Sequence, residues 1–411
     1  MSSAADGVVA AEHAASAIKE SGVRPDLLLA FVSGAHVPSA AAISTVLRRQ
    51  LDPGCLLGVS ASGVISGGIE VEHGPAIALL GLRLPGTNLR VFGSDDLAAI
   101  PGHDAPTEKL ARVMGAGPDL RTTILLADPF SVPIQALLPE FDLALRHAQA
   151  TAPVIGGLAS GAHVPGGNAL FLNDRTLHRG FVAVSIAGRV SVDTVVSQGA
   201  RPIGPNLIIT KARKNLIMQI GQRPAIAVIE EVVNAMPGRE RQLLAGGLMI
   251  GRVIDESKRR FGRGDYLVRR ITGMDAASGS IAVDGLFRAG QTICLHARHP
   301  ETASSDLSLL LDAQALHEAP AAALLISCNA RGSRLFDRPH HDASAVVRAF
   351  SPTMPGEQLA AGGKPIRAGG SRIPMSGFFA SGEIGPIAGR TFVHGYTACL
   401  ALFRRATSEH P

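Results

Sequence analysis

Apolar and polar positions alternate along the chain so that one order of elements is predicted three times. Short, nearly continuous apolar runs, which are typical of buried strands, lie at 27–32, 123–127 and 323–328. An amphipathic stretch follows each run, at 40–51, 134–150 and 343–350. Two further apolar runs complete each unit, the last of them at 76–82, 181–186 and 396–403. The pattern predicts an α/β fold of two pseudo-symmetric domains, built on repeated strand-helix-strand-strand units with mixed sheets.

A short glycine-bounded motif recurs in each unit, ahead of the last apolar run. Its copies are Gly58-Val-Ser-Ala-Ser-Gly63, Gly156-Gly-Leu-Ala-Ser-Gly161 and Gly377-Phe-Phe-Ala-Ser-Gly382. Because glycine tolerates a positive φ, the flanking glycines are expected to allow a sharp turn and the close approach of another backbone or a ligand. Ser62, Ser160 and Ser381 are then expected to donate hydrogen bonds into a shared cavity. The alternative is that these small residues only let strands pack on helices.

The chain outside the three units has a different character. The prolines of Arg201-Pro202-Ile203-Gly204-Pro205 favour a connecting segment, and a domain boundary is expected near residue 210. Beyond it the pattern predicts strands at 215–220, 266–272, 280–283 and 291–297, and helices at 225–236 and 306–316. The third unit is expected to carry an insertion at 351–372, which is rich in Gly and Pro. The expected divisions are an amino-terminal helix within 1–24 and domains at 25–210 and 211–405.

Composition and charge narrow the class of protein. Hydrophobic residues make up 46% of the 411 residues and charged residues 18%, which indicates a globular chain. The net charge of +5 is dispersed, and its densest stretch, Lys258-Arg259-Arg260 with Arg263, is expected at a helix end, so nucleic-acid binding is not expected. No apolar run is long enough for a membrane span, and the first residues do not resemble a signal peptide. Four scattered cysteines indicate a reducing compartment, and we expect a cytoplasmic protein.

The third unit carries the richest polar set. Ser327-Cys328-Asn329-Ala330-Arg331-Gly332 ends its first strand, and open α/β sheets place ligands at such carboxyl ends. Arg331 is a candidate to bind a carboxylate bidentately, with Asn329 and Glu383 reading an amine or amide and His341 as a further contact. These residues, together with Ser62, Ser160 and Ser381, are the predicted contacts of a small zwitterion. The alternative is that Asp342 caps the following helix and Arg331 pairs with a nearby acid.

Other kinds of chemistry have weaker signals. His340 and His341 are adjacent and point apart in regular structure, so a metal site is not expected. A single histidine can ligate haem, and the candidates for that alternative are His340, His341 and His394. A third hypothesis is an enzyme that uses Cys328 or an Ala-Ser-Gly serine on an amide or thioester. The chain has no G-x-S-x-G, P-loop or dinucleotide motif, so no catalytic motif is recognised.

Several segments together resemble one known family. The segments Leu56–Val64, Leu325–Gly332, Pro339–Asp342, Gly377–Pro386 and His394–Ala398 follow in the order seen in the FIST family. The resemblance covers about 25–404, with 25 to about 205 similar to the family's amino-terminal domain and the remainder to its carboxyl-terminal domain.

The resemblance carries expectations about function. It implies an intracellular sensory protein that binds a small ligand such as an amino acid, often beside signalling proteins. Some relatives bind haem and sense nitric oxide to regulate a histidine kinase, and eukaryotic relatives occur on F-box proteins. Many relatives carry cysteine where this chain has Ala200, which weakens a thiol mechanism here.

Overall fold

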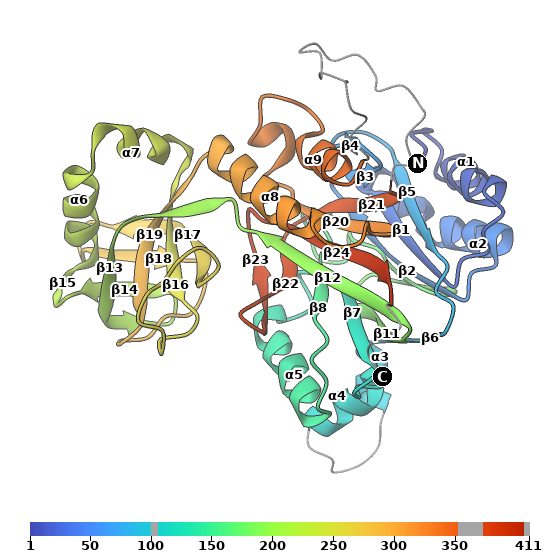
Figure 1. The fold of residues 1–411 in the computed structure, drawn as a ribbon, viewed down its shortest axis with the longest axis horizontal. Helices are drawn as coiled ribbons and strands as arrows, with labels where there is room; N and C mark the ends of the chain where they lie inside the picture. Colours follow the sequence, from blue (N-terminus) through green and yellow to red (C-terminus); the bar gives the residue numbers. More distant parts are fainter. Residues whose placement is uncertain (100–105, 352–372, 407–411) are drawn as a thin grey trace.

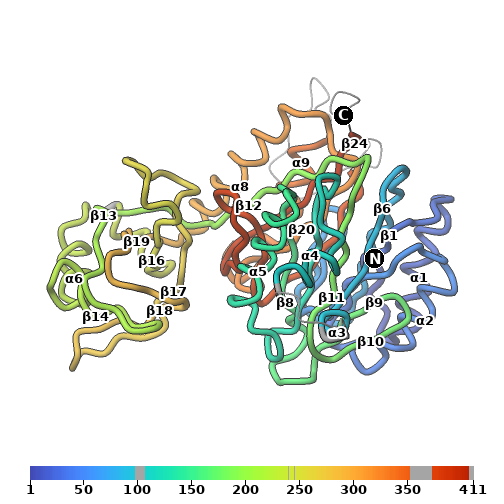
Figure 2. Tube along the Cα trace, turned by 90° about the horizontal axis from the view of Figure 1, so that it is seen from below, coloured from blue at the N-terminus to red at the C-terminus, as the bar shows by residue number. Residues whose placement is uncertain are grey.

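Two bodies make up the protein, as Figures 1 and 2 show. The computed structural model describes residues 1–99, 106–351 and 373–406. We call 1–197 with 299–406 the core body and 200–298 the barrel body. The insertion expected at 351–372 lies outside the described residues apart from Ser351.

The first unit of the core body forms around one parallel pair of strands. Strand β1 lies next to β2 in parallel, with Leu27 opposite Cys55, and next to β5 in the antiparallel direction. The helix α2 connects β1 to β2. The bounds are β1 Leu27–Ser33, α2 Ala40–Leu51, β2 Cys55–Ala61 and β5 Ile77–Leu82.

The second and third units have the same strand order and directions. In both, the first strand lies between a parallel second strand and an antiparallel last strand. The second unit consists of β7 Leu120–Ala127, α5 Ile134–His147, β8 Val154–Leu158 and β11 Phe181–Gly188. The third consists of β20 Ala322–Cys328, α9 His341–Ala349, β21 Met375–Ala380 and β24 Ala398–Arg405. The α/β fold with strand-helix-strand-strand units and mixed sheets is confirmed, although β24 begins two residues later than expected.

A hairpin follows each glycine-bounded motif and crosses to a neighbouring sheet. The hairpin after Ser62 pairs with β21, the hairpin after Ser160 pairs with β2, and the hairpin after Ser381 pairs with β8. The hairpins are β3 Val64–Ser66 with β4 Ile69–Val71, β9 Leu170–Leu172 with β10 Arg175–Leu177, and β22 Glu383–Ile387 with β23 Arg390–His394. The three units are therefore linked in a closed cycle, and each motif marks a crossing point.

Two more strands extend the sheets at their edges. Strand β6, Thr87–Gly93, pairs with β11, and β12, Val190–Ser197, pairs with β24. The resulting orders are β10-β9-β2-β1-β5, β23-β22-β8-β7-β11-β6 and β12-β24-β20-β21-β3-β4.

The three sheets share one apolar interior. Leu29, Ile124 and Leu324 come from different units and are fully buried in the same cluster, and the rings of Phe31 and Phe378 stack there with centroids 5.2 Å apart. Helices cover the outer faces, with α1 and α2 on the first sheet, α4 and α5 on the second, and α8 and α9 on the third. Burial on both faces explains why the central strands read as continuous apolar runs. The remaining helices of this body are α1 Gly7–Glu20, η1 Gly34–Ser39, α3 Ser94–Ala99, α4 Pro106–Met114, α8 Pro300–Ala315 and η3 Gly332–Arg334.

Neighbouring strands in the barrel body run antiparallel throughout. Six strands follow the order β13-β19-β16-β17-β18-β14, and the pairing of β13 with β14 closes them into a barrel. Their bounds are β13 Ala200–Arg213, β14 Leu216–Ile220, β16 Leu248–Val253, β17 Tyr266–Asp275, β18 Ser280–Val283 and β19 Thr292–Arg298. The short β15 Arg223–Pro224 adds to β14, and the helices are α6 Ala225–Ala235, α7 Gly238–Gln242 and η2 Leu243–Gly246.

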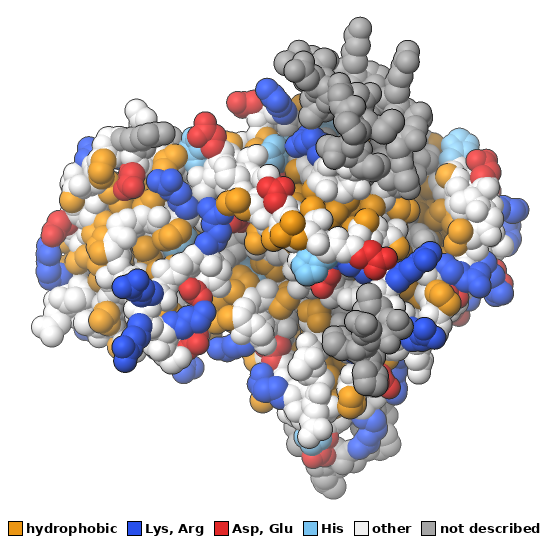
Figure 3. Space-filling view, viewed as in Figure 1, with side chains coloured by type: hydrophobic (Ala, Val, Ile, Leu, Met, Phe, Trp, Pro, Cys, Tyr) orange, Lys and Arg blue, Asp and Glu red, His pale blue; other side chains and the backbone are white. Residues whose placement is uncertain are grey.

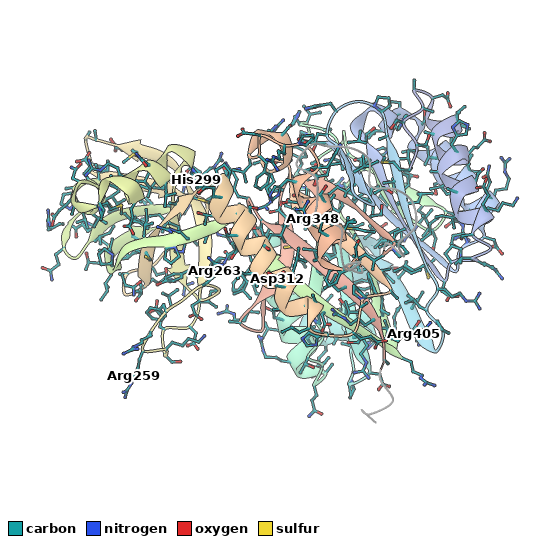
Figure 4. The ribbon with its side chains drawn as sticks, turned by 45° about the horizontal axis from the view of Figure 1, so that its top comes forward. Arg259, Arg263, His299, Asp312, Arg348 and Arg405 are labelled. Carbon is teal, nitrogen blue, oxygen red and sulfur yellow. The ribbon has the colours of Figure 1, made fainter. Side chains whose placement is uncertain are left out.

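Two local predictions are wrong in this body. The proline-rich segment that starts at Arg201 is part of β13, where Pro202 faces β19 on one side only and a bulge between Ile203 and Asn206 accommodates Gly204-Pro205. Residue 210 therefore falls inside a strand. The basic stretch 258–263 lies in the loop between β16 and β17 and not at a helix end, and Figure 4 shows Arg259 projecting from it.

The charged surface shows no single concentration on the face drawn in Figure 3, where acidic and basic side chains interleave. In the basic loop, Lys258 pairs with Asp265 at 2.5 Å, and Arg263 reaches Asp306 at 3.2 Å. Across residues 1–99, 106–351 and 373–406, none of the helices has the length and apolar character that a bilayer crossing requires.

Candidate functional site

The three crossing points meet in one hydrogen-bonded ring. The backbone N–H of Ser160 donates to the Ser60 carbonyl, and that of Ser381 donates to the Leu158 carbonyl, each at 3.2 Å. The corresponding third bond would join Ser62 to Phe379. Instead, the Ser160 hydroxyl lies between them: it accepts from the Ser62 N–H at 2.9 Å and donates to the Phe379 carbonyl. Ser160 therefore completes the ring with its side chain.

Close backbone approach explains the first glycine of each motif. A Cβ built on Gly156 would lie 1.7 Å from the Leu125 carbonyl oxygen, and one on Gly377 would lie 1.7 Å from that of Leu325. The equivalent distance for Gly58 is 2.4 Å, to Ala30. The expected close approach is present, but the expected positive φ is wrong, because none of the motif glycines adopts one. These glycines allow the close approach of neighbouring strands, whereas the alternative interpretation had expected strands to pack on helices.

A cavity of about 330 Å³ opens at this ring, and we call it the central cavity. Ser62 and Ser160 reach it from the ends of β2 and β8, and Asn329 reaches it from the end of β20. Its charged and titratable lining is Glu72, His73, His163 and Arg334. The structure thus brings three of the predicted contact residues together, one from each unit, at the carboxyl ends of parallel strands.

The charges around the central cavity have both signs. Glu72 is fixed by the neighbouring turn, because its carboxylate accepts from the Ser333 N–H at 2.8 Å and from the Ser333 hydroxyl at 2.7 Å. Arg334 and His73 are exposed at the same opening. Sequence reasoning missed Glu72, Arg334 and His163, because they lie in loops whose spatial proximity depends on the crossing of the hairpins.

The other predicted contacts lie outside the central cavity. The Ser381 hydroxyl donates to the Ala159 carbonyl at 2.8 Å and belongs to the ring. Arg331 and Glu383 are fully buried, and His341 lines a different cavity of about 620 Å³ between α8 and α9.

Arg331 forms a buried ion pair with Asp342. Its Nε and Nη2 atoms donate to the two carboxylate oxygens at 2.7 and 2.8 Å, and both side chains are at most 1% exposed. Burial opposes ionisation of Asp342, yet the adjacent guanidinium holds the pKa of this carboxyl well below its usual range. The bidentate acceptor of Arg331 is thus an acid of the chain itself, as the alternative interpretation proposed.

Glu70 is a buried acid that sequence reasoning missed. It lies on β4, accepts from the Ala343 N–H at the start of α9 at 2.8 Å, and is 4% exposed, whereas neighbouring Ile69 is 49% exposed. Burial, with repulsion from Asp342, raises the pKa of Glu70 to about 7. Glu70 lies on the buried side of β4 and Ile69 on the open side. A pattern that assigns apolar residues to the buried face and polar residues to the open face would therefore place both residues on the wrong side.

Cys328 and Glu383 form a second buried pair of titratable groups. Burial, reinforced by the nearby Glu383, raises the pKa of the Cys328 thiol to about 12, and burial raises the pKa of Glu383 well above its usual value. The Glu383 Oε2 accepts from the Thr397 N–H at 3.1 Å, while Oε1 has no partner among the described residues. A thiol of this kind is protonated at neutral pH, which does not support nucleophilic catalysis through Cys328.

The three candidate histidines do not fit haem ligation as they stand. Both ring nitrogens of His341 are engaged, by Asp342 and Ser304, each at 3.0 Å. The Nδ1 of His340 accepts from the Glu70 N–H at 3.0 Å, so a neutral ring carries its proton on Nε2 and has no free lone pair for iron. His394 is 3% exposed, its Nε2 donates to the Gly385 carbonyl, and burial lowers its pKa to about 3. Haem binding stays a prediction that this geometry does not support.

The fold and the cavity define a class of protein: an α/β protein in which three interlinked units meet at one small polar cavity. The family models agree with this class, since residues 26–223 match the FIST N domain and residues 225–386 match the FIST C domain. The chain belongs to the FIST family. FIST domains are associated with sensory and signal-transduction proteins that bind small ligands.

Similar proteins occur in mycobacteria. Uncharacterized protein Mb0898c of Mycobacterium bovis is 36% identical over 389 residues, which cover 93% of this chain and 91% of the relative. Uncharacterized protein MT0656 of Mycobacterium tuberculosis is 34% identical over 397 residues, which cover 96% of this chain and 95% of the relative. The similarity extends over both bodies.

Proposed function

We propose that this protein is a cytoplasmic sensor that binds a small polar ligand in the central cavity. The observation that carries the proposal is the meeting of Ser62, Ser160 and Asn329, one from each unit, at one cavity. Asn329 is well suited to read a ligand. Among the described residues, its side chain takes part in one hydrogen bond, a long contact from the Cys328 Sγ at 3.9 Å.

The charges and size of the central cavity favour a small zwitterion such as an amino acid. Glu72 is suited to an ammonium group and Arg334 to a carboxylate, and the same lining includes the polar side chains of Ser62, Ser160 and Asn329. A volume of about 330 Å³ is at the lower end of the range for ligand sites, which favours a metabolite over a larger cofactor.

The position of the central cavity also supports a sensory role. Ser62 and Ser160 belong to the part that matches the FIST N domain, and Asn329 to the part that matches the FIST C domain. A ligand that contacts all three favours the arrangement of units in which they are closest, and it can shift a conformational equilibrium only through such differential contacts. We propose that the response is passed to a signalling protein, such as a histidine kinase.

A thermal-shift screen of the amino acids and small polar metabolites tests this function. The parent chain is expected to gain stability with one chemical group of ligands, and Asn329→Ala and Glu72→Gln are expected to reduce that gain. Arg405→Gln is the matched control, because Arg405, labelled in Figure 4, is exposed at the end of β24 and does not line the central cavity. If Asn329→Ala and Glu72→Gln kept the gain in full, as Arg405→Gln is expected to do, the proposed site would be contradicted. A screen in which no compound stabilises the parent chain would contradict the proposed class of ligand.

A further inference from the structure

We propose that the cleft between the two bodies is a second binding site, which accepts a small organic anion with an apolar portion. This site is separate from the central cavity and goes beyond the proposed function. The cleft has a volume of about 790 Å³. Its walls are the start of α5 and strand β23 from the core body, and β16, β17 and the segment 285–288 from the barrel body. In Figure 1, α5 and β23 lie on the side of the core body that faces the barrel body.

Four arginines from both bodies line the cleft. Arg252, Arg269 and Arg288 come from the barrel body, and Arg390 comes from the core body. Within the described part of the chain, none of the four forms an ion pair with a carboxylate. Arg252 donates to the Leu286 carbonyl at 3.1 Å and Arg269 donates to the Val393 carbonyl at 2.7 Å, which orients both guanidinium groups without neutralising them.

The two acids in the lining are already engaged by backbone groups. The Asp142 carboxylate accepts from the Thr391 N–H at 3.0 and 3.2 Å, and Glu256 Oε1 accepts from the Thr292 N–H at 2.8 Å. Asp284 attracts Arg269 but does not line the cleft. Positive charge therefore exceeds negative charge in the lining, and an incoming anion would relieve this imbalance.

The pKa values of the arginines agree with this imbalance. Burial lowers the pKa of Arg252, and repulsion from Arg390 and Arg288 lowers it further. Burial lowers the pKa of Arg269 to about 10, although Asp284 opposes the change. The guanidinium groups repel one another in a partly desolvated place, where a bound anion would form strong charge-assisted hydrogen bonds.

Apolar side chains also line the cleft, and they define the second part of the ligand. Arg252 lies over the Phe287 ring at 5.9 Å, and Arg390 lies over the Phe392 ring at 5.4 Å. Ile134 and Leu138 of α5 and the 62% exposed Leu286 add aliphatic surface. The first turn of α5, which has no capping side chain, also faces the cleft and adds a partial positive charge. A phosphate or carboxylate head attached to an aromatic or aliphatic body matches this surface.

Binding of 8-anilinonaphthalene-1-sulfonate, an aromatic sulfonate whose fluorescence rises in apolar surroundings, provides the test. The full chain is titrated with the probe, and the double variant Arg252→Gln/Arg390→Gln is compared with Arg270→Gln. Arg270 is an exposed neighbour on β17 that does not line the cleft. Loss of two charge-assisted contacts is expected to raise the Kd of the double variant at least about tenfold, while Arg270→Gln leaves it within about twofold.

Competition identifies which part of the probe is recognised. Phenyl phosphate is expected to displace the probe from the parent, whereas phenol at the same concentration is not, because phenol lacks the anionic head. Equal displacement by both compounds, or the same Kd in the parent and the double variant, would overturn the proposal. The ligand found for the central cavity should leave probe binding unchanged. The two proposals can therefore fail independently, because the thermal-shift screen tests the central cavity and the probe titration tests the cleft.

Discussion

The Ser160 hydroxyl accepts a hydrogen bond from the backbone N–H of Ser62 at 2.9 Å, and through it two units of the core body are joined. The same hydroxyl donates to the Phe379 carbonyl of the third unit. One side chain therefore connects the crossing points of all three units, directly beside the central cavity.

Removal of this hydroxyl is expected to weaken the fold. Ser160→Ala leaves the Ser62 N–H and the Phe379 carbonyl without their partner, which costs about 1–3 kcal/mol of unfolding free energy. Ser381→Ala, at the equivalent position, removes one donor from an exposed residue and is expected to cost less than about 1 kcal/mol. Urea denaturation of both variants measures the difference, and equal losses would contradict the bridging role of Ser160.

The first glycine of the motif is expected to tolerate no side chain. In Gly156→Ala the new Cβ would meet the Leu125 carbonyl, so strands β7 and β8 must separate, at a cost of at least about 3 kcal/mol. Gly117→Ala is the control, because its Cβ would meet nothing within 4 Å and its φ is not positive. Thermal denaturation compares the two variants, and a loss in Gly156→Ala no larger than that in Gly117→Ala would show that the strands can move apart freely.

Because Arg331 and Asp342 form a buried ion pair, removing one charge is expected to cost more unfolding free energy than removing both. Arg331→Met leaves a buried carboxylate without its partner and is expected to cost about 3–5 kcal/mol. Arg331→Met/Asp342→Leu removes both charges and is expected to cost less than the single variant. Arg338→Met, at an exposed position, should change stability little. Chemical denaturation measures the free energy of unfolding of each variant. A double variant that lost as much stability as the two single variants together would contradict the coupling of Arg331 and Asp342.

The buried Glu70 is expected to make the free energy of unfolding depend on pH. The pKa of Glu70 is about 7 in the folded chain, above its ordinary value of 4.5, so the folded chain holds the proton more tightly than the unfolded chain. The associated stability is complete below pH 4.5 and is lost as the pH rises to about 7, by roughly 3 kcal/mol. The groups that surround Glu70 are Asp342, Glu72 and Arg331, with the N–H of Ala343.

The variant Glu70→Gln provides the control for this dependence. Glutamine resembles the protonated acid, so the difference in unfolding free energy between parent and variant should change between pH 4.5 and 7 and stay constant above about pH 7.5. Guanidinium denaturation at a series of pH values gives this difference. A difference that does not vary with pH would show that Glu70 ionises normally. The buried Glu383 contributes equally to both proteins and cancels.

Much of the fold could be predicted from the sequence, because the central strands are buried on both faces. Continuous apolar runs such as Leu27–Ser33 and Ala322–Cys328 mark them plainly, and α2 begins and ends as its pattern predicts. The exchange of hairpins between sheets could not be predicted, because an apolar pattern identifies a strand but not its partner. Pro202 illustrates a further limit: an edge position and a bulge make a strand possible where composition favours a connection.

The candidate site could be predicted only in part, for the same reason. Ser62, Ser160 and Asn329 follow apolar strands, so their place at strand ends is readable from the sequence. Arg331 follows the same rule by sequence, yet it turns inward to Asp342. Glu72 gives no local sign that it will face a cavity, since only the crossing of the first hairpin to β21 brings it there.

Hydrogen–deuterium exchange with and without the best compound from the ligand screen tests the central claim most directly. Binding in the central cavity predicts protection in three segments that are distant in sequence, namely 60–74, 160–163 and 329–334, with the Asn329→Ala variant losing this protection and Arg405→Gln keeping it. Protection confined to the cleft between the two bodies, or to the cavity between α8 and α9, would contradict the account.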